Sequence, residues 1–186
     1  MELDKCITER RSVRKYQPEP IPKAIVDKIL NAGVWAPSGM NLQPWRFMVI
    51  QDRNTINKLS ERVKQIGSKL PLPSQYIELF KSKEDTIFYG APLLILVCVP
   101  MREDNMKMVN YLDCGLAAQN MLLTAYQEGL GSCFIGFASF LNQDPEILEE
   151  VGVPRNMDLL APLIFGYPAD IPRAPPREIK ILKWIQ

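Results

Sequence analysis

Apolar and polar residues follow two different periods along the chain, and the period changes from one segment to the next. Apolar residues that recur every three to four positions indicate helices with one face on a core. This spacing predicts helices over residues 3–10, 22–35, 53–66, 105–129 and 144–151. Short apolar runs rich in β-branched residues predict strands over residues 46–51, 93–99 and 159–165, and the run at 93–99 is expected to be buried on both faces.

Three further stretches do not follow either period. Residues 17–22 hold three prolines, each of which disfavours helix in the residue before it, so this stretch is expected to run extended until Pro22 begins a helix. Residues 67–75 hold two prolines and a glycine and are expected to form a loop. Residues 76–89 are aromatic-rich, which favours a half-buried helix; contact with a cofactor is the alternative.

The last stretch, residues 170–186, combines three prolines with Ile179, Ile181 and Trp184, and lysines alternate with these apolar residues. A proline-rich segment with apolar side chains cannot form a core by itself. We therefore expect this arm to lie against another surface.

Composition limits the class of protein. A chain of 186 residues with 47% hydrophobic and 23% charged residues is typical of a single soluble domain, here expected to span residues 1–186. The 22 Lys and Arg residues balance 21 Asp and Glu residues, which disfavours a nucleic-acid-binding protein. No apolar run approaches the roughly 20 residues of a membrane span, and no basic leader precedes one, so a cytoplasmic location without membrane contact is expected.

The four cysteines and the absence of histidine narrow the chemistry. The cysteines form no C-x-x-C pair and mostly lie in apolar runs, as expected of reduced core residues. Without histidine, Ser-His and Cys-His nucleophilic schemes and the commonest metal ligand are excluded, and we expect no metal site. If the protein is an enzyme, a bound cofactor is expected to carry the chemistry.

A dense cationic segment follows the first predicted helix. Three guanidiniums and a hydroxyl lie within five positions, and no carboxylates follow that would pair with them; these residues are Arg10, Arg11, Ser12 and Arg14. Guanidinium groups bind phosphate oxygens through two parallel hydrogen bonds, and a neighbouring hydroxyl adds a donor. A phosphate site is one interpretation, and a solvated basic helix end is the other.

Two glycine-containing segments could bring backbone groups close to a ligand. The first is a rigid, donor-rich turn that contains Pro37, Ser38, Gly39 and Asn41 and ends on Trp45. The second contains Gly131 and Gly136, which form no G-x-G-x-x-G motif, so a Rossmann fold is disfavoured. These glycines fit either a helix cap and tight turn or a backbone that approaches a flat ring.

Four motifs together resemble the nitroreductase family of flavin enzymes. They are Arg-Arg-Ser-x-Arg-x-Tyr from position 10, Ala-Pro-Ser-x-x-Asn-x-Gln-Pro-Trp from position 36, the helix around residues 113–125, and Gly-Leu-Gly-Ser-Cys at residues 129–133. The resemblance implies an α+β fold with a central, mostly antiparallel sheet flanked by helices, in an intertwined homodimer. It also implies that residues 67–90 form a substrate lid and that residues 170–186 wrap the partner subunit.

The resemblance further implies FMN as the cofactor. Its phosphate would be held by Arg10, Ser12 and Arg177, with Arg173 as the competing assignment. Arg14 would lie near N1 and O2 of the ring, and the amides of Ile135 and Gly136 near N5 and O4. Arg11 would contact ribityl or phosphate oxygens. The other chain would contribute Pro37, Ser38, Gly39 and Asn41.

The implied activity is transfer of a hydride from NADH or NADPH through flavin N5 to a nitroaromatic, a quinone or a similar small acceptor, by a ping-pong mechanism. No side chain acts as a nucleophile in this scheme. Reductive dehalogenation and breakdown of the flavin itself are alternatives within the family. A non-catalytic flavin- or anion-binding protein is the alternative outside it.

Overall fold

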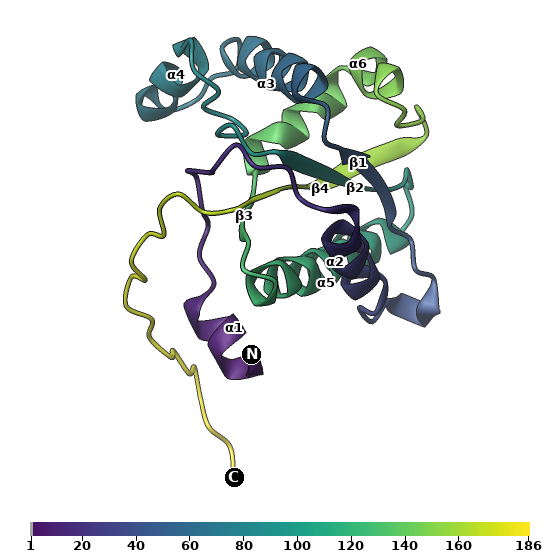
Figure 1. The fold of residues 1–186 in the computed structure, drawn as a ribbon. Helices are drawn as coiled ribbons and strands as arrows, with labels where there is room; N and C mark the ends of the chain where they lie inside the picture. Colours follow the sequence, from purple (N-terminus) through teal and green to yellow (C-terminus); the bar gives the residue numbers. More distant parts are fainter. Residues whose placement is uncertain (1) are drawn as a thin grey trace.

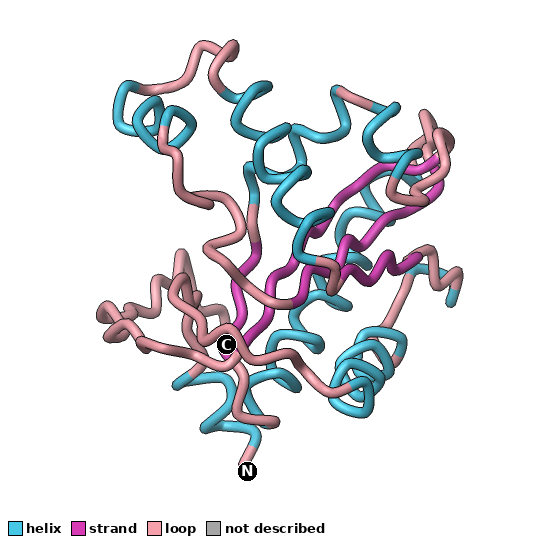
Figure 2. Tube along the Cα trace, turned by 45° about the horizontal axis from the view of Figure 1, so that its top comes forward, coloured by secondary structure: helices cyan, strands magenta, loops and turns pink. Residues whose placement is uncertain are grey.

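The computed structural model describes residues 2–186 and confirms the predicted α+β fold. Its sheet has four antiparallel strands in the order β1-β2-β4-β3. Their bounds are Arg46–Ile50 for β1, Leu93–Pro100 for β2, Gly131–Phe134 for β3 and Met157–Gly166 for β4. Figure 2 shows these strands running through the middle of the molecule with helices on both sides.

The helices form one layer on each face of the sheet (Figure 1). One layer contains α3 (Arg53–Gly67), α4 (Ser74–Lys81), α6 (Pro145–Glu150) and the 3-10 helix η2 (Gly136–Gln143). The other layer contains α2 (Lys23–Val34) and α5 (Met106–Gln127), with α1 (Leu3–Glu9) packed on α5 and the short 3-10 helix η1 (Gly39–Asn41) after α2.

Strand β2 lies inside the sheet, between β1 and β4, and both of its faces are apolar. Leu94 and Leu96 belong to the core cluster under α3 and η2, whereas Leu93, Ile95 and Val97 belong to the cluster under α2 and α5. Every residue from position 93 to 99 is buried, which confirms the prediction of a strand covered on both sides. The sheet thus separates two cores and fixes the ends of its strands relative to each other.

Helix α5 is apolar on two faces. Its inner face buries Ala117 and Met121 against α2 and the sheet. Its outer face leaves Met108 65% exposed and Leu112 63% exposed, and a Cβ added to Gly115 would meet no atom within 4 Å. The outer face is therefore an apolar surface with room for close approach.

One local prediction was wrong and one strand was not predicted, and both cases have physical explanations. The helix expected over residues 76–89 ends at Lys81, because the Asp85 carboxylate accepts hydrogen bonds from the backbone N–H groups of Phe88 (2.8 Å) and Gly90 (3.0 Å). These bonds form a turn in place of a helix. The sequence patterns also did not predict β3. Its Gly131 makes room for Val13, whose side chain would lie 2.8 Å from a Cβ at that position.

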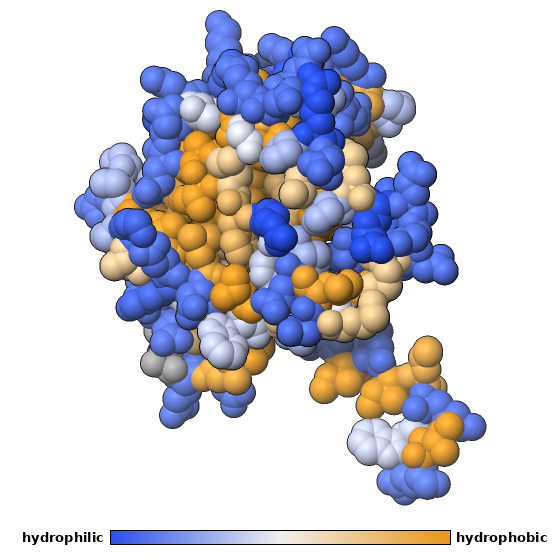
Figure 3. Space-filling model, turned by 90° about the vertical axis from the view of Figure 1, so that its right-hand side faces the viewer, coloured by the Kyte–Doolittle hydropathy of each residue, from blue (hydrophilic) through white to orange (hydrophobic). Residues whose placement is uncertain are grey.

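The chain after β4 leaves the body of the protein as an arm without helix or strand. Figure 3 shows its end projecting from the rest of the molecule with apolar side chains uncovered. Ile179 is 89% exposed and Ile185 is 79% exposed. Within one chain, nothing among the described residues covers this end of the arm.

Candidate functional site

The cationic segment is held extended along the sheet. Ser12 forms a parallel bridge with Ser132 of β3, and the Val13 N–H donates to the Ser132 carbonyl at 3.0 Å. Tyr16 forms an antiparallel bridge with Pro168 at the start of the arm. Successive side chains of an extended segment point to opposite sides. The side chains of Arg10, Ser12 and Arg14 therefore point to one side of the segment, and those of Arg11 and Val13 point to the other.

Three of the predicted phosphate and ring contacts converge beside β3. Burial raises the pKa of the Cys133 thiol. The three groups that oppose this rise in the pKa are Arg14, Ser12 and Arg10, so all three lie near Cys133 of β3. Burial lowers the pKa of Arg10, and the neighbouring charges of Arg11 and Arg177 lower it further. Arg177 of the arm thus lies close enough to Arg10 for its charge to act on that guanidinium.

Within the described residues these arginines have no acidic partner. Among residues 2–186, the arginines that pair with carboxylates are Arg62, Arg102 and Arg155. Arg10 is half-buried all the same, in a region where a guanidinium is costly to hold without an anion. The arrangement suits an anionic group better than it suits bulk water.

A cavity of about 220 Å³ lies next to this cluster. It brings Arg14 together with Ile135 and Gly136, as the sequence predicted, and its other lining residues are Thr86, Ile87, Tyr89, Phe134 and Phe137. The Arg14 guanidinium carbon lies 5.9 Å from the centre of the Tyr89 ring. Tyr89 belongs to the aromatic segment noted in the sequence. Phe137 was not predicted at the site, although it directly follows Gly136 and could have been predicted from that position.

Of the two amides predicted to face a ligand, that of Ile135 already has an acceptor within the chain. Its N–H donates to the Pro162 carbonyl at 2.9 Å, as part of the pairing beside β4. The N–H of Gly136 has no acceptor among residues 2–186, and a Cβ at that position would meet nothing within 4 Å. Gly136 is therefore the backbone donor that remains available.

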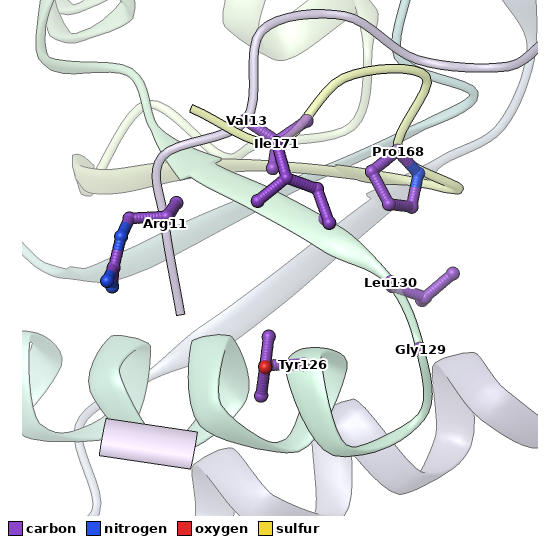
Figure 4. Close-up of a pocket in the computed structure, with 8 residues that line it drawn as sticks. Arg11, Val13, Tyr126, Gly129, Leu130, Pro168 and Ile171 are labelled. Carbon is purple, nitrogen blue, oxygen red and sulfur yellow. The ribbon is translucent and has the colours of Figure 1, made fainter. Parts of the chain in front are cut away.

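Arg11 lies apart from this cavity. Its Nη1 donates to the carbonyls of Thr8 at 2.7 Å and Arg10 at 2.6 Å, at the end of α1. It lines a separate cavity of about 180 Å³, where Figure 4 shows Tyr126 of α5 opposite Ile171 of the arm. The structure therefore gives Arg11 a role as a helix cap.

The donor-rich turn lies at the other end of α5. Gly39 packs on Val109 and Asp113, near the start of that helix, whereas Arg11 shares its cavity with Tyr126 near the helix end. The rise of about 1.5 Å per residue separates these positions by about 20 Å. Figure 1 shows η1 and the cationic segment on opposite sides of the molecule. One chain does not bring together Pro37, Ser38, Gly39 and Asn41 with Arg10, Ser12 and Arg14.

Three comparisons place the chain among known proteins. The model of the nitroreductase family matches residues 7–167. A Methanothermobacter thermautotrophicus protein, provisionally named NADH dehydrogenase/NAD(P)H nitroreductase, is 29% identical over 99% of this chain and 88% of its own length. A Danio rerio iodotyrosine deiodinase is 27% identical over 89% of this chain and 60% of its own length.

A solved structure is similar throughout. A Bacteroides fragilis nitroreductase with bound FMN superposes with a TM-score of 0.85 and 30% identity, over 100% of this chain and 98% of that one. None of the helices within residues 2–186 has the length and apolar character needed to cross a membrane. The same residues contain no cluster of Cys, Asp or Glu side chains arranged to hold a metal. The family match covers most of the chain, and the chain therefore belongs to the nitroreductase family.

Proposed function

We propose that the chain is an NAD(P)H-dependent flavin oxidoreductase that binds FMN beside β3. One observation carries the proposal: Arg10, Ser12 and Arg14 all lie near Cys133 of β3, Arg14 lines the adjoining cavity, and no carboxylate among residues 2–186 neutralises the two arginines. The likeness to the Bacteroides fragilis nitroreductase with bound FMN supports the choice of cofactor.

The residues present fit this cofactor. Arg10, Ser12 and Arg177 would hold the phosphate, because guanidinium and hydroxyl donors match its oxygens. Arg177 is preferred to Arg173 because its charge reaches Arg10. The Gly136 N–H would donate to the edge of the ring, where the lack of a Cβ allows close approach.

When bound, FMN supplies a ring that takes a hydride from NADH or NADPH and passes electrons to an acceptor. The positive charge of Arg14 would stabilise negative charge on the ring. Phe137 and Tyr89 give the cavity aromatic walls, which suit flat molecules such as nicotinamide, nitroaromatics and quinones. Because donor and acceptor would use the same cavity in turn, we propose a ping-pong mechanism.

A lid would cover one wall of this cavity. Tyr76 and Phe80 of α4 lie edge-on to Phe137, with ring centres 5.2 and 5.3 Å away. The end of the predicted lid is fixed, because Lys64 is 3% exposed and donates to the Ser82 carbonyl at 3.1 Å. We therefore narrow the predicted lid from residues 67–90 to residues 68–81.

The functional unit would be a homodimer. Three features support it: the apolar outer face of α5, the uncovered arm at residues 170–186, and the separation of the 37–41 turn from the cationic segment. A second copy could cover the first two and complete the site with its own turn. The four free, buried cysteines suit a reducing compartment, and a cytoplasmic location stays a prediction.

Reductive dehalogenation is the second candidate, since a Danio rerio iodotyrosine deiodinase is 27% identical over 89% of this chain. It would use the same cavity with a halogenated phenol as acceptor. Anaerobic assays with one nitroaromatic, one quinone and one iodinated phenol would rank the two candidates.

Spectroscopy of the purified protein tests the main proposal. The protein should bind FMN, and the visible absorbance of the bound flavin should bleach when NADH or NADPH is added without oxygen. Colour without bleaching would favour a flavin carrier. Failure to bind FMN after reconstitution would contradict the proposal.

A further inference from the structure

Asp113 is a buried carboxylate that the proposed chemistry does not use. It lies on α5 and is 4% exposed. Both of its oxygens accept from one backbone N–H, that of Gly39, at 3.2 Å from Oδ1 and 3.1 Å from Oδ2. No lysine or arginine among residues 2–186 pairs with it. Burying a carboxylate with a single neutral hydrogen-bond donor has a large free-energy cost. We therefore expect this residue to have a specific role.

Asp113 binds the backbone N–H of Gly39, which lies within the donor-rich turn. Gly39 has no room for a side chain on this inner side, since a Cβ would lie 2.5 Å from Val109 Cγ1. The turn is therefore attached to α5 at one point by a hydrogen bond and by close packing. Both contacts lie on the side of the turn that faces the helix.

The rest of the turn is rigid and faces outward. Met40, Asn41 and Gln43 adopt left-handed backbone conformations with φ of 51°, 55° and 47°, which residues with side chains rarely do. The Ser38 hydroxyl accepts from the Gln43 N–H at 3.0 Å, and the Gln43 amide donates to Asn41 Oδ1 at 3.1 Å. Met40 is 76% exposed. A strained conformation of this kind persists only where neighbouring groups fix it.

We infer that Asp113 is a positioning residue that acts on the flavin site of the partner copy. Through Gly39 it would fix the Pro37–Asn41 turn of its own chain in the shape that completes the site formed by the other chain's Arg10, Ser12 and Arg14. This inference rests on the proposed function, because it needs a dimer and a flavin. Preorganised donors bind more tightly than mobile ones, since the ordering cost is already met.

Substitution of Asp113 gives the first test. Asp113→Ala should raise the dissociation constant for FMN by about tenfold or more, the usual effect of losing a hydrogen bond to a charged group. Asp113→Asn keeps one acceptor and should restore part of the affinity. The matched control is Asn120→Ala, which removes another hydrogen bond from α5, to the Ala32 carbonyl at 3.2 Å. It should leave FMN affinity unchanged, and equal affinities for Asp113→Ala and the wild type would overturn the inference.

A second pair of variants acts on the turn without touching the carboxylate. Gly39→Ala should weaken FMN binding, because its methyl group would clash with Val109. Val109→Ala in the same chain removes the clashing atom and should recover affinity. These variants test the inference even if Asp113→Ala does not fold. Wild-type FMN affinity in Gly39→Ala would show that the turn plays no part in binding.

Mixed dimers decide whether the effect crosses between subunits. Chains carrying Arg10→Ala and chains carrying Asp113→Ala, each with its own affinity tag, can be co-expressed and purified as mixed dimers. One of the two sites then has an intact Arg10 and an intact partner turn, so half of the wild-type FMN content should return. No recovery above the parental variants would overturn the inference. If the wild-type chain itself binds no FMN, the proposed function has failed instead.

Discussion

The cationic segment at residues 10–14 and the turn at residues 37–43 lie near opposite ends of α5 and satisfy their polar groups in opposite ways. Arg14 lines a cavity, and neither Arg10 nor Arg14 has a carboxylate partner among residues 2–186. The turn, in contrast, forms its own hydrogen bonds through Ser38, Asn41 and Gln43. The cationic segment therefore needs a ligand to supply an anionic partner, whereas the turn is already ordered by its own hydrogen bonds.

This difference shows how one chain can carry two halves of a site that it cannot complete alone. Among residues 2–186 the cationic half lacks a partner group, and the turn lies exposed near the other end of α5. Each half makes sense if a second copy of the chain supplies the other. The predictions below test that division of roles, beginning with the largest effect.

Arg10→Ala should have the largest effect on the cationic half. Loss of the charged hydrogen bonds to phosphate should weaken FMN binding by about 100-fold, or about 3 kcal/mol. Fluorescence titration of FMN measures this. Arg155→Ala is the matched control, since it removes a surface guanidinium paired with Glu149. Equal affinities for the two variants would show that Arg10 contributes only general charge.

Truncation after Asp170 should remove both Arg177 and the apolar arm. We expect the dimer to dissociate more readily and FMN affinity to fall about tenfold or more, because a phosphate contact is lost. Sedimentation and FMN titration measure the two effects separately. In the full-length chain, Arg177→Ala should reproduce only the loss of affinity, and Arg173→Ala should reproduce neither. A larger effect from Arg173→Ala would reverse that assignment.

Leu112→Glu should weaken the dimer at the outer face of α5. A buried leucine contributes about 1.5–3 kcal/mol, and the new charge would have to be desolvated. Sedimentation at several protein concentrations should show a higher dissociation constant for the dimer. Gln65→Glu, on the opposite face of the sheet, is the control and should leave the dimer intact. An unchanged dimer in Leu112→Glu would place the interface elsewhere.

Arg14→Gln should change the flavin potential more than the affinity. Losing the positive charge should favour the oxidised flavin by about tenfold, which is about 30 mV for a two-electron couple. Spectroelectrochemical titration measures the potential. A potential equal to that of the wild type, with affinity reduced as in Arg10→Ala, would assign Arg14 to the phosphate.

Arg11→Ala should have the smallest effect, although it is next to Arg10 in the sequence. Its guanidinium caps α1 through the Thr8 carbonyl, so stability should fall by about 0.5–1 kcal/mol. Thermal unfolding of the apoprotein measures this change. FMN affinity should stay within about twofold of the wild type. A large loss of affinity would contradict the separation of the two sides of this segment.

The elements that the sequence predicted are those with a continuous apolar run or with apolar residues at a regular spacing. Strand β2 was predicted because all its residues are apolar, and α5 because its apolar residues recur at helical spacing. Gly129, at which the helix over residues 105–129 was predicted to end, has φ of +80°, the left-handed conformation that commonly follows a helix. In these cases the information lies within the element itself.

The elements that were missed depend on distant residues. Strand β3 has only four residues and exists because it pairs with β4 and the cationic segment. The Ile135 amide is bound to Pro162, and the Gly39 amide to Asp113, 74 positions away. Arg11 points away from Arg10 and Arg14 because side chains alternate in an extended segment, and this alternation applies only once residues 10–14 are known to be extended. Asp113 gave one signal that was not used: a charged residue on the buried side of a predicted helix.

The most direct test of the shared site is the FMN stoichiometry of the protein as a function of its association state. Sedimentation with detection at the visible absorbance of flavin can follow protein mass and bound FMN together. The account predicts that FMN sediments only with dimers, at two per dimer, and that the Leu112→Glu variant releases FMN as it dissociates. Monomers that retain FMN with the affinity of the dimer would contradict it.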